Sequence, residues 1–158
     1  GHVVAIEPSE RRRALALELG MDAAVAPDAA ADYLLQQSGQ VGADVVVEAS
    51  GVPALLQTAM DLSRVGGTVA LLSYLAAPSE ISGAKLMARE TRIVGANAYT
   101  RADFRRTMDF IADGRVRVEP LHTRTEGLDG LPQALSDLAS ASTDDVKILI
   151  DPRREPGA

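Results

Sequence analysis

A carboxylate, Glu7, directly follows the β-branched run 3–6 and precedes Pro8. A continuous apolar run of this kind predicts a strand buried on both faces, as in parallel sheets. A carboxylate at the end of such a strand can accept hydrogen bonds from the ribose hydroxyls of a dinucleotide, and its charge repels a 2′-phosphate. Glu7 also fits a plain polar strand end, and both interpretations stay open. Arg12, one turn into the following segment, either faces the adenosine or is solvated, and its neighbours Arg11 and Arg13 are expected to be only solvated.

The clearest strand, 44–49, ends at Ser50 and Gly51. In an open parallel sheet, ligands bind at the carboxyl ends of the strands. The missing Cβ of Gly51 would let a flat ring or a ribose approach closely, although the glycine also fits a simple turn into the next helix. Glu48, near the end of the same strand, is expected to point into an adjacent loop and to bond to backbone, which is a structural role.

A second buried strand, 68–72, has its end at Leu72 to Tyr74, which is predicted to lie at the same ligand edge of the sheet. The segment also fits a plain buried strand after a turn. Lys147 lies in the final apolar strand, 146–150. A lone cation there needs an anion such as a cofactor phosphate, or a carboxylate partner. Otherwise its aliphatic chain must extend so that the ammonium group reaches solvent.

The chain holds no cysteine, and its two histidines are His2 and His122. Thiolate nucleophiles, disulfides and zinc sites are therefore not expected, nothing builds a Ser/His/Asp triad, and His122 receives no role. The net charge of −6 without a basic stripe argues against nucleic acid and anionic membranes as partners. No apolar run reaches the ~20 residues of a membrane span, and no signal peptide is visible, so a cytoplasmic location is expected.

Strand-like and helical segments alternate along the chain, which predicts an α/β fold with a parallel sheet and helices on both faces. The 158 residues and the apolar content of 46% fit one globular domain, expected over 1–152, with a frayed tail at 153–158. Ser9 and Gly20 are the expected N-cap and stop of the first helix. The expected strands are 3–6, 23–26, 44–49, 68–72, 92–95 and 146–150, and the expected helices are 10–19, 29–37, 53–64 (stopped by Gly66-Gly67), 85–88, 100–112 and 132–141.

Together these segments resemble the cofactor-binding domain of the medium-chain dehydrogenase/reductase family, which includes the zinc-type alcohol, polyol and threonine dehydrogenases. The resemblance covers nearly all of residues 3–152. It is carried by four segments in order: VVAIEPSERRRALALELGMDAAV, GADVVVEASGVPALLQTAMDLSRVGGTVALLS, ETRIVGA and VKILID. The resemblance implies a Rossmann-like fold, an oxidoreductase function, an NAD cofactor and a homo-oligomer.

The resemblance also implies where each end of the cofactor would bind. On the adenosine side, Glu7 matches the acidic residue that binds the ribose and selects NAD, and Arg12 matches a basic position beside the adenosine. Lys147 matches a basic position near the pyrophosphate or a ribose.

For the nicotinamide end, Ser50 and Gly51 match strand-end positions near the ribose. Leu72 and Ser73 match positions whose backbone contacts the carboxamide, and Ala98 falls near another nicotinamide contact.

The sequence departs from the family in two ways. No G-x-G-x-x-G occurs, and the first strand and glycine-rich loop expected before Val3 are absent; that loop would hold the pyrophosphate through its N–H groups. Zinc belongs to a catalytic domain that is also absent, so the chain is not expected to be catalytic alone. The missing strand is central in the order 3-2-1-4-5-6, so strands 3–6 and 44–49 would flank a gap. Direct pairing of these two strands, or a longer protein, is favoured over filling by another chain.

Three functions are weighed. The first is an NAD(H)-binding domain fragment of a zinc-type alcohol dehydrogenase-like oxidoreductase. The alternative is a non-catalytic oligomerisation or interaction remnant of that fold, which the absent phosphate loop favours for the isolated chain. A methyltransferase-like domain ranks below both, because it would need its own glycine-rich loop and a final antiparallel hairpin.

Overall fold

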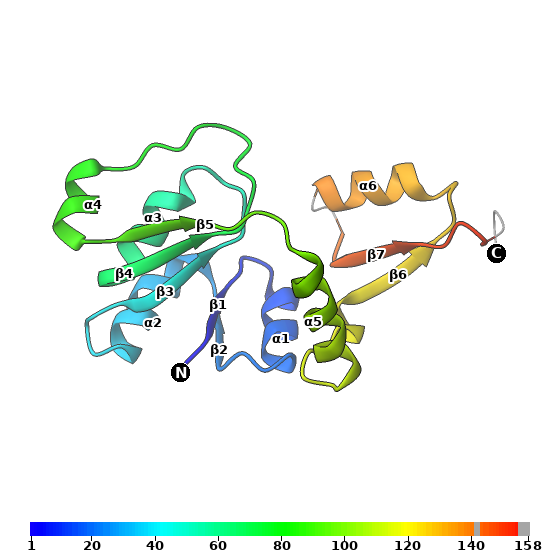
Figure 1. Cartoon of the computed structure of the whole chain (residues 1–158), viewed down its shortest axis with the longest axis horizontal. Helices are drawn as coiled ribbons and strands as arrows, with labels where there is room; N and C mark the ends of the chain where they lie inside the picture. Colours follow the sequence, from blue (N-terminus) through cyan, green and yellow to red (C-terminus); the bar gives the residue numbers. More distant parts are fainter. Residues whose placement is uncertain (141–142, 155–158) are drawn as a thin grey trace. The chain divides into compact units, whose positions relative to one another are not determined.

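A computed structural model describes residues 1–140 and 143–154. The chain divides into two compact units, one formed by Gly1–Ala26 with Arg101–Ala158 and the other by Pro27–Thr100. Figure 1 shows the helices and strands of each. Every strand pair described is parallel, which confirms the α/β class expected from the alternation of segments.

The first unit begins with a strand, a helix and a second strand. Ser9 caps α1 by accepting a hydrogen bond from the Arg12 N–H at 3.4 Å. Gly20 ends this helix with a φ of +103°, a conformation that favours glycine. The elements of the unit are β1 (Val4–Ile6), α1 (Glu10–Glu18), β2 (Ala23–Val25), α5 (Arg101–Ala112), β6 (His122–Glu126), α6 (Leu131–Ser140) and β7 (Lys147–Ile150), with β1 paired to β2 and β6 to β7.

The second unit contains a three-stranded sheet in the order β3-β4-β5. Its core joins Met60 of α3 to Val69 of β4, both fully buried, and Val46 and Ile93 pack against them from the neighbouring strands. Glu48 of β3 lies opposite Leu71 of β4, so the two strands end at the same edge. The elements are α2 (Ala30–Gln37), β3 (Ala43–Glu48), α3 (Leu55–Leu62), β4 (Ser63–Leu71), α4 (Gly83–Arg89) and β5 (Arg92–Gly95).

The start of β4 differs from the sequence expectation. The helix was expected to reach Arg64 and to stop at Gly66-Gly67, but it ends at Leu62 and the strand begins at Ser63. The two glycines lie inside the strand, beside a register shift relative to β3. A Cβ on Gly67 would lie 2.8 Å from the Arg64 carbonyl oxygen. The glycines therefore permit an irregular strand rather than a helix stop.

Strand β6 was missed from the sequence, and the segment 122–126 was left without a regular element. Its residues, HTRTE, are polar throughout, so no apolar run or alternation marks them as a strand. The segment becomes a strand through its pairing with β7. The single domain expected over 1–152 stays a prediction, and residues 155–158 of the expected tail lie outside the described part. Strands 3–6 and 44–49 fall in different units, so their direct pairing also stays a prediction.

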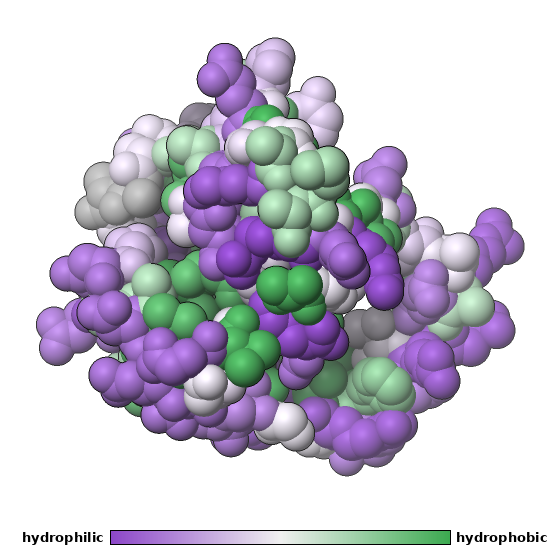
Figure 2. All heavy atoms as spheres, turned by 90° about the vertical axis from the view of Figure 1, so that its left-hand side faces the viewer, coloured by the Kyte–Doolittle hydropathy of each residue, from purple (hydrophilic) through white to green (hydrophobic). Residues whose placement is uncertain are grey.

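The surface combines apolar and charged side chains. On the face drawn in Figure 2, hydrophobic patches are bordered by hydrophilic side chains. In the β3 strand, Val45 and Val47 are more than half exposed, whereas Val46 between them packs on the core. Among the helices that the structure describes, none is both long and apolar enough to cross a membrane.

Candidate functional site

The carboxylate of Glu48 is the centre of a polar cluster at the ends of β3 and β4. Its Oε1 accepts a hydrogen bond from the Ser50 backbone N–H at 2.8 Å and another from the Ser50 hydroxyl. Its Oε2 accepts a hydrogen bond from the Ser73 hydroxyl. The Leu72 N–H donates to the Glu48 carbonyl oxygen at 2.9 Å. The expected contact of Glu48 with a neighbouring loop is confirmed, and it extends to two loops.

Glu48 is only 5% exposed, and its surroundings keep it ionised. Burial raises the pKa of this carboxyl, but the hydroxyls of Ser50 and Ser73 and the backbone N–H groups of Ser50 and Gly51 outweigh that effect and lower the pKa below its ordinary value. A buried charge is tolerated only when it is well hydrogen-bonded. The cluster is therefore an anion held entirely by neutral donors.

Gly51 brings the two loops close together. Its φ is +75°, and a Cβ built on it would lie 3.3 Å from the Tyr74 carbonyl oxygen. Any larger residue would be strained in this conformation and would press on the loop after β4. Leu72 is 55% exposed and Tyr74 is 93% exposed, so the edge beyond the cluster is open to solvent.

Four of the predicted cofactor-binding residues are thus brought together in the second unit: Ser50, Gly51, Leu72 and Ser73. The other three, Glu7, Arg12 and Lys147, belong to the first unit. Ala98 follows β5 and has a φ of +56°, which is uncommon for a residue other than glycine.

Glu7 lies at the carboxyl end of β1, where the chain turns into α1. Its Oε1 accepts a hydrogen bond from the Ser9 N–H at 2.9 Å, and its backbone oxygen accepts one from Arg13 at 2.7 Å. Arg13 also donates to the Pro8 carbonyl oxygen at 2.7 Å. The expectation that Arg13 is merely solvated is wrong, because its guanidinium ties down the turn that carries Glu7.

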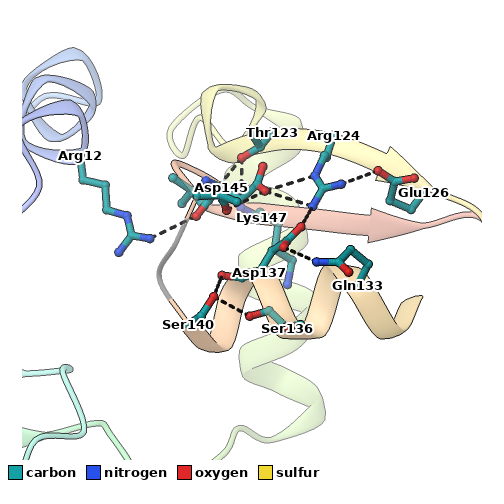
Figure 3. Close-up of polar contacts among 12 residues, drawn as sticks. Arg12, Thr123, Arg124, Glu126, Gln133, Ser136, Asp137, Ser140, Asp145 and Lys147 are labelled. Carbon is teal, nitrogen blue, oxygen red and sulfur yellow. Dashed lines mark hydrogen bonds and ion pairs between the residues drawn. The ribbon is translucent and has the colours of Figure 1, made fainter. Parts of the chain in front are cut away.

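Arg12 contacts the last part of the chain within the same unit. Its Nη2 donates to the Asp145 carbonyl oxygen at 3.2 Å (Figure 3). Arg12 also lines a hollow of about 350 Å³ together with Leu15 and His122. The neighbouring Arg11 forms an exposed ion pair with Asp144 at 3.2 Å, so it is not solely solvated as expected.

Lys147 is exposed at the start of β7. Its backbone N–H lies 3.4 Å from the Thr123 hydroxyl, and within the described ranges no carboxylate forms an ion pair with its ammonium group. Of the alternatives left open by the sequence, a side chain that reaches solvent matches this arrangement, and the position remains accessible to an anion.

The sequence reasoning missed a second polar cluster, centred on Arg124 of β6. The guanidinium of Arg124 contacts three carboxylates, those of Glu126 at 2.6 Å, Asp137 at 2.5 Å and Asp145 at 3.2 Å (Figure 3). Burial lowers the pKa of Arg124, but the hydrogen bonds to Glu126 and Asp137 and the charge of Asp145 outweigh it and raise the pKa. The i, i+2 spacing of Arg124 and Glu126 places both on one face of a strand, and this was the available sequence signal.

The Arg124 cluster joins β6, α6 and the segment just before β7, which is a structural role. In the part of the chain that the structure describes, no group of three or more His, Asp or Glu side chains is arranged to hold a metal ion. The chemistry that the described strand ends offer is hydrogen bonding and charge.

A parallel α/β fold with polar groups gathered at the carboxyl ends of adjacent strands defines a Rossmann-like domain. Residues 1–113 match the family described as zinc-binding dehydrogenase. The chain belongs to this family.

Individual relatives agree with that assignment. The chain is 28% identical over 153 residues to 2-dehydro-3-deoxy-L-galactonate 5-dehydrogenase of Pseudoalteromonas atlantica, covering 90% of this chain and 45% of that protein. Among solved structures, 2R,3R-butanediol dehydrogenase from Bacillus subtilis superposes with a TM-score of 0.81 at 26% identity, covering 95% of this chain and 43% of that one. An alcohol dehydrogenase from Escherichia coli CFT073, complexed with NADH, has a TM-score of 0.81 at 20% identity, covering 94% and 44%. The chain thus spans less than half the length of these relatives.

Proposed function

We propose that the chain binds NAD(H) and is the cofactor-binding part of a zinc-type alcohol or polyol dehydrogenase. The observation that carries the proposal is the Glu48 cluster, which joins the ends of β3 and β4 and presents Ser50, Gly51 and Ser73 at one edge. Ligands of open parallel sheets bind outside the carboxyl ends of the strands. The NADH complex of the E. coli protein and the NADP complex of a zinc-binding dehydrogenase from Sinorhizobium meliloti, which share the fold, support a nicotinamide dinucleotide as the ligand.

Glu7 is proposed to select NAD over NADP. Its Oε1 is engaged by the Ser9 N–H, and within the described residues no hydrogen bond occupies Oε2. A carboxylate with a free oxygen at a strand end can accept hydrogen bonds from ribose hydroxyls and repels a 2′-phosphate. Arg12 and Lys147 are proposed to contribute positive charge on the adenosine and pyrophosphate side.

The experiment is a calorimetric titration of NAD, and separately NADP, into the purified chain, its Glu7→Ala variant and a Glu10→Ala variant. Glu10 is an exposed carboxylate in the first turn of the same helix and serves as the matched control. Loss of hydrogen bonds to a charged group weakens binding by about tenfold or more. We expect this loss for NAD with Glu7→Ala alone, together with a gain in NADP affinity.

Two results would contradict the proposal in different ways. Absence of binding of either nucleotide to the unsubstituted chain would exclude cofactor binding and would favour the interaction remnant. Equal NAD affinity in the Glu7→Ala and Glu10→Ala variants would exclude the role of Glu7 while leaving the strand-end site in place.

The reaction itself is proposed for the whole enzyme. The relatives named above act on a sugar acid and a diol by their names, so the proposed substrate class is an alcohol or polyol. Since the chain spans less than half the length of these relatives, the catalytic zinc and the substrate contacts are proposed to belong to other parts of the whole enzyme.

Self-association is part of the same proposal. In the described sheet, β5 pairs with β4 along one edge only, and a strand with a free edge can pair with a second copy. Sedimentation equilibrium of the purified chain tests this point, and a monomer at all concentrations would refute it.

A further inference from the structure

Glu48 bonds to the loops that follow two different strands. Its Oε1 accepts two hydrogen bonds from Ser50, one from the backbone N–H at 2.8 Å and one from the hydroxyl. Its Oε2 accepts the hydroxyl hydrogen of Ser73, which lies 25 positions further along the chain. The two oxygens of one carboxylate thus serve two loops separately.

The charge on Glu48 is not balanced by a cation. The described residues provide no Lys or Arg ion pair to this carboxylate, which is almost fully buried. A buried charge is seldom a gain for stability over a neutral or apolar replacement. Unlike a neutral amide of the same shape, however, the carboxylate fixes the direction of every hydrogen bond it makes, because it can only accept.

An ionised carboxylate only accepts hydrogen bonds, whereas a hydroxyl has one donor hydrogen and two acceptor lone pairs. Both serine hydroxyls must therefore donate their hydrogens to the Glu48 carboxylate. For Ser50, a lone pair is then used by the Val52 N–H at 3.1 Å. For Ser73, no further hydrogen bond occurs within the described residues, and the residue is only half-buried.

We propose that Glu48 is a positioning residue that turns Ser73 into a hydrogen-bond acceptor at the strand-end edge, and that Ser73 Oγ accepts an N–H or O–H donor from the nicotinamide-nucleoside half of the dinucleotide. This inference rests on the proposed NAD binding. It adds that the Ser73 side chain contacts the ligand and that Ser73 is the acceptor in that hydrogen bond. Two groups of that half offer such donors, the carboxamide N–H₂ and the ribose hydroxyls.

Replacing Glu48 by glutamine tests the polarity with almost no change in shape. The two donors of Ser50 keep the amide oxygen on their side, so the amide N–H₂ faces Ser73. The Ser73 hydroxyl then accepts from the amide, and its own hydrogen turns outward. A ligand donor would meet a protein donor, and binding would weaken more than by simple loss of a contact.

The test compares NAD with ADP, which lacks both the nicotinamide and its ribose, in calorimetric titrations of four proteins: the unsubstituted chain and the Glu48→Gln, Ser73→Ala and Asp44→Asn variants. Asp44→Asn neutralises an exposed carboxylate at the other end of β3 and is the matched control. We expect NAD affinity to fall by about fivefold in Ser73→Ala and by about tenfold in Glu48→Gln, with ADP affinity unchanged in all four.

The 3-acetylpyridine analogue of NAD, which lacks the carboxamide N–H₂, identifies the donor. If the carboxamide donates, the unsubstituted chain prefers NAD to the analogue and Ser73→Ala abolishes that preference. If a ribose hydroxyl donates, Ser73→Ala weakens both ligands equally. Either pattern supports the acceptor role of Ser73.

NAD binding that neither Glu48→Gln nor Ser73→Ala weakens would overturn this inference and leave the proposed function intact. Equal weakening of NAD and ADP would also overturn it, because a general loss of structure would then be the cause. Binding of neither ligand by the unsubstituted chain would refute the proposed function itself, and this contact with it. If Glu48→Gln does not fold, as judged by circular dichroism, Ser73→Ala decides the question.

Discussion

The side chains of Glu48 and Ser73 are joined by a hydrogen bond from the Ser73 hydroxyl to the Glu48 carboxylate, although 25 positions separate them. The contact is possible because β3 and β4 are parallel neighbours whose carboxyl ends meet, with Glu48 opposite Leu71. The bond adds a side-chain link between two loops that also approach each other at Gly51 and Tyr74. The candidate site depends on this link.

The pH dependence of stability should reveal the ionised state of Glu48. Because its pKa in the folded chain is lowered from the ordinary value of 4.5, its contribution to stability is fully present above pH 4.5 and is lost as the pH falls through the lowered pKa. Glutamine does not titrate. We therefore expect the stability of the unsubstituted chain to fall relative to that of Glu48→Gln below pH 4.5, measured by urea unfolding between about pH 7 and pH 3. Parallel curves for the two proteins would contradict this prediction.

Gly51→Ala should destabilise the chain and disturb the edge. The φ of +75° disfavours any side chain, and the added Cβ would lie 3.3 Å from the Tyr74 carbonyl oxygen. We expect a loss of about 1–2 kcal/mol in the free energy of unfolding. Gly83→Ala is the control, since Gly83 begins α4 without a positive φ and a Cβ there meets nothing within 4 Å. Urea unfolding should show no loss for Gly83→Ala, and equal losses in both variants would refute the argument.

Arg124→Met should destabilise the first unit in a salt-dependent way. The substitution leaves Glu126, Asp137 and Asp145 without their shared cation, so the three carboxylates repel one another. We expect the thermal midpoint to fall by several degrees in dilute buffer, and by less in concentrated salt, because salt screens the repulsion.

The control for this prediction is Arg153→Met. Arg153 pairs with Asp151 at 3.2 Å, and its side chain is 90% exposed, so its removal should leave the midpoint unchanged. A fall in the midpoint for Arg124→Met that is the same at all salt concentrations would point to lost packing instead of charge repulsion.

Local features of the structure were largely predictable from sequence. The strand 92–95 has the expected bounds, α5 ends at Ala112 as expected, and Ser9 caps α1 as expected. Capping, turn residues and apolar periodicity act over a few neighbouring residues, so they can be recognised without knowing the fold. The start of β4 was not recognised, because its glycines have the same local signature as a helix stop.

For the candidate site, too, some features follow from the sequence and others only from the tertiary structure. The sequence by itself determined the α/β class and the placement of Glu7, Ser50, Gly51 and Ser73 at strand ends, because those positions follow from where each strand stops. Only the tertiary structure decided that Glu48 joins two of these ends, that Arg12 reaches the backbone of Asp145, 133 positions away, and that Arg124 gathers three carboxylates. Such contacts depend on which strands become neighbours and in what register, and the energies that select them are summed over the packed unit, not written in any short segment.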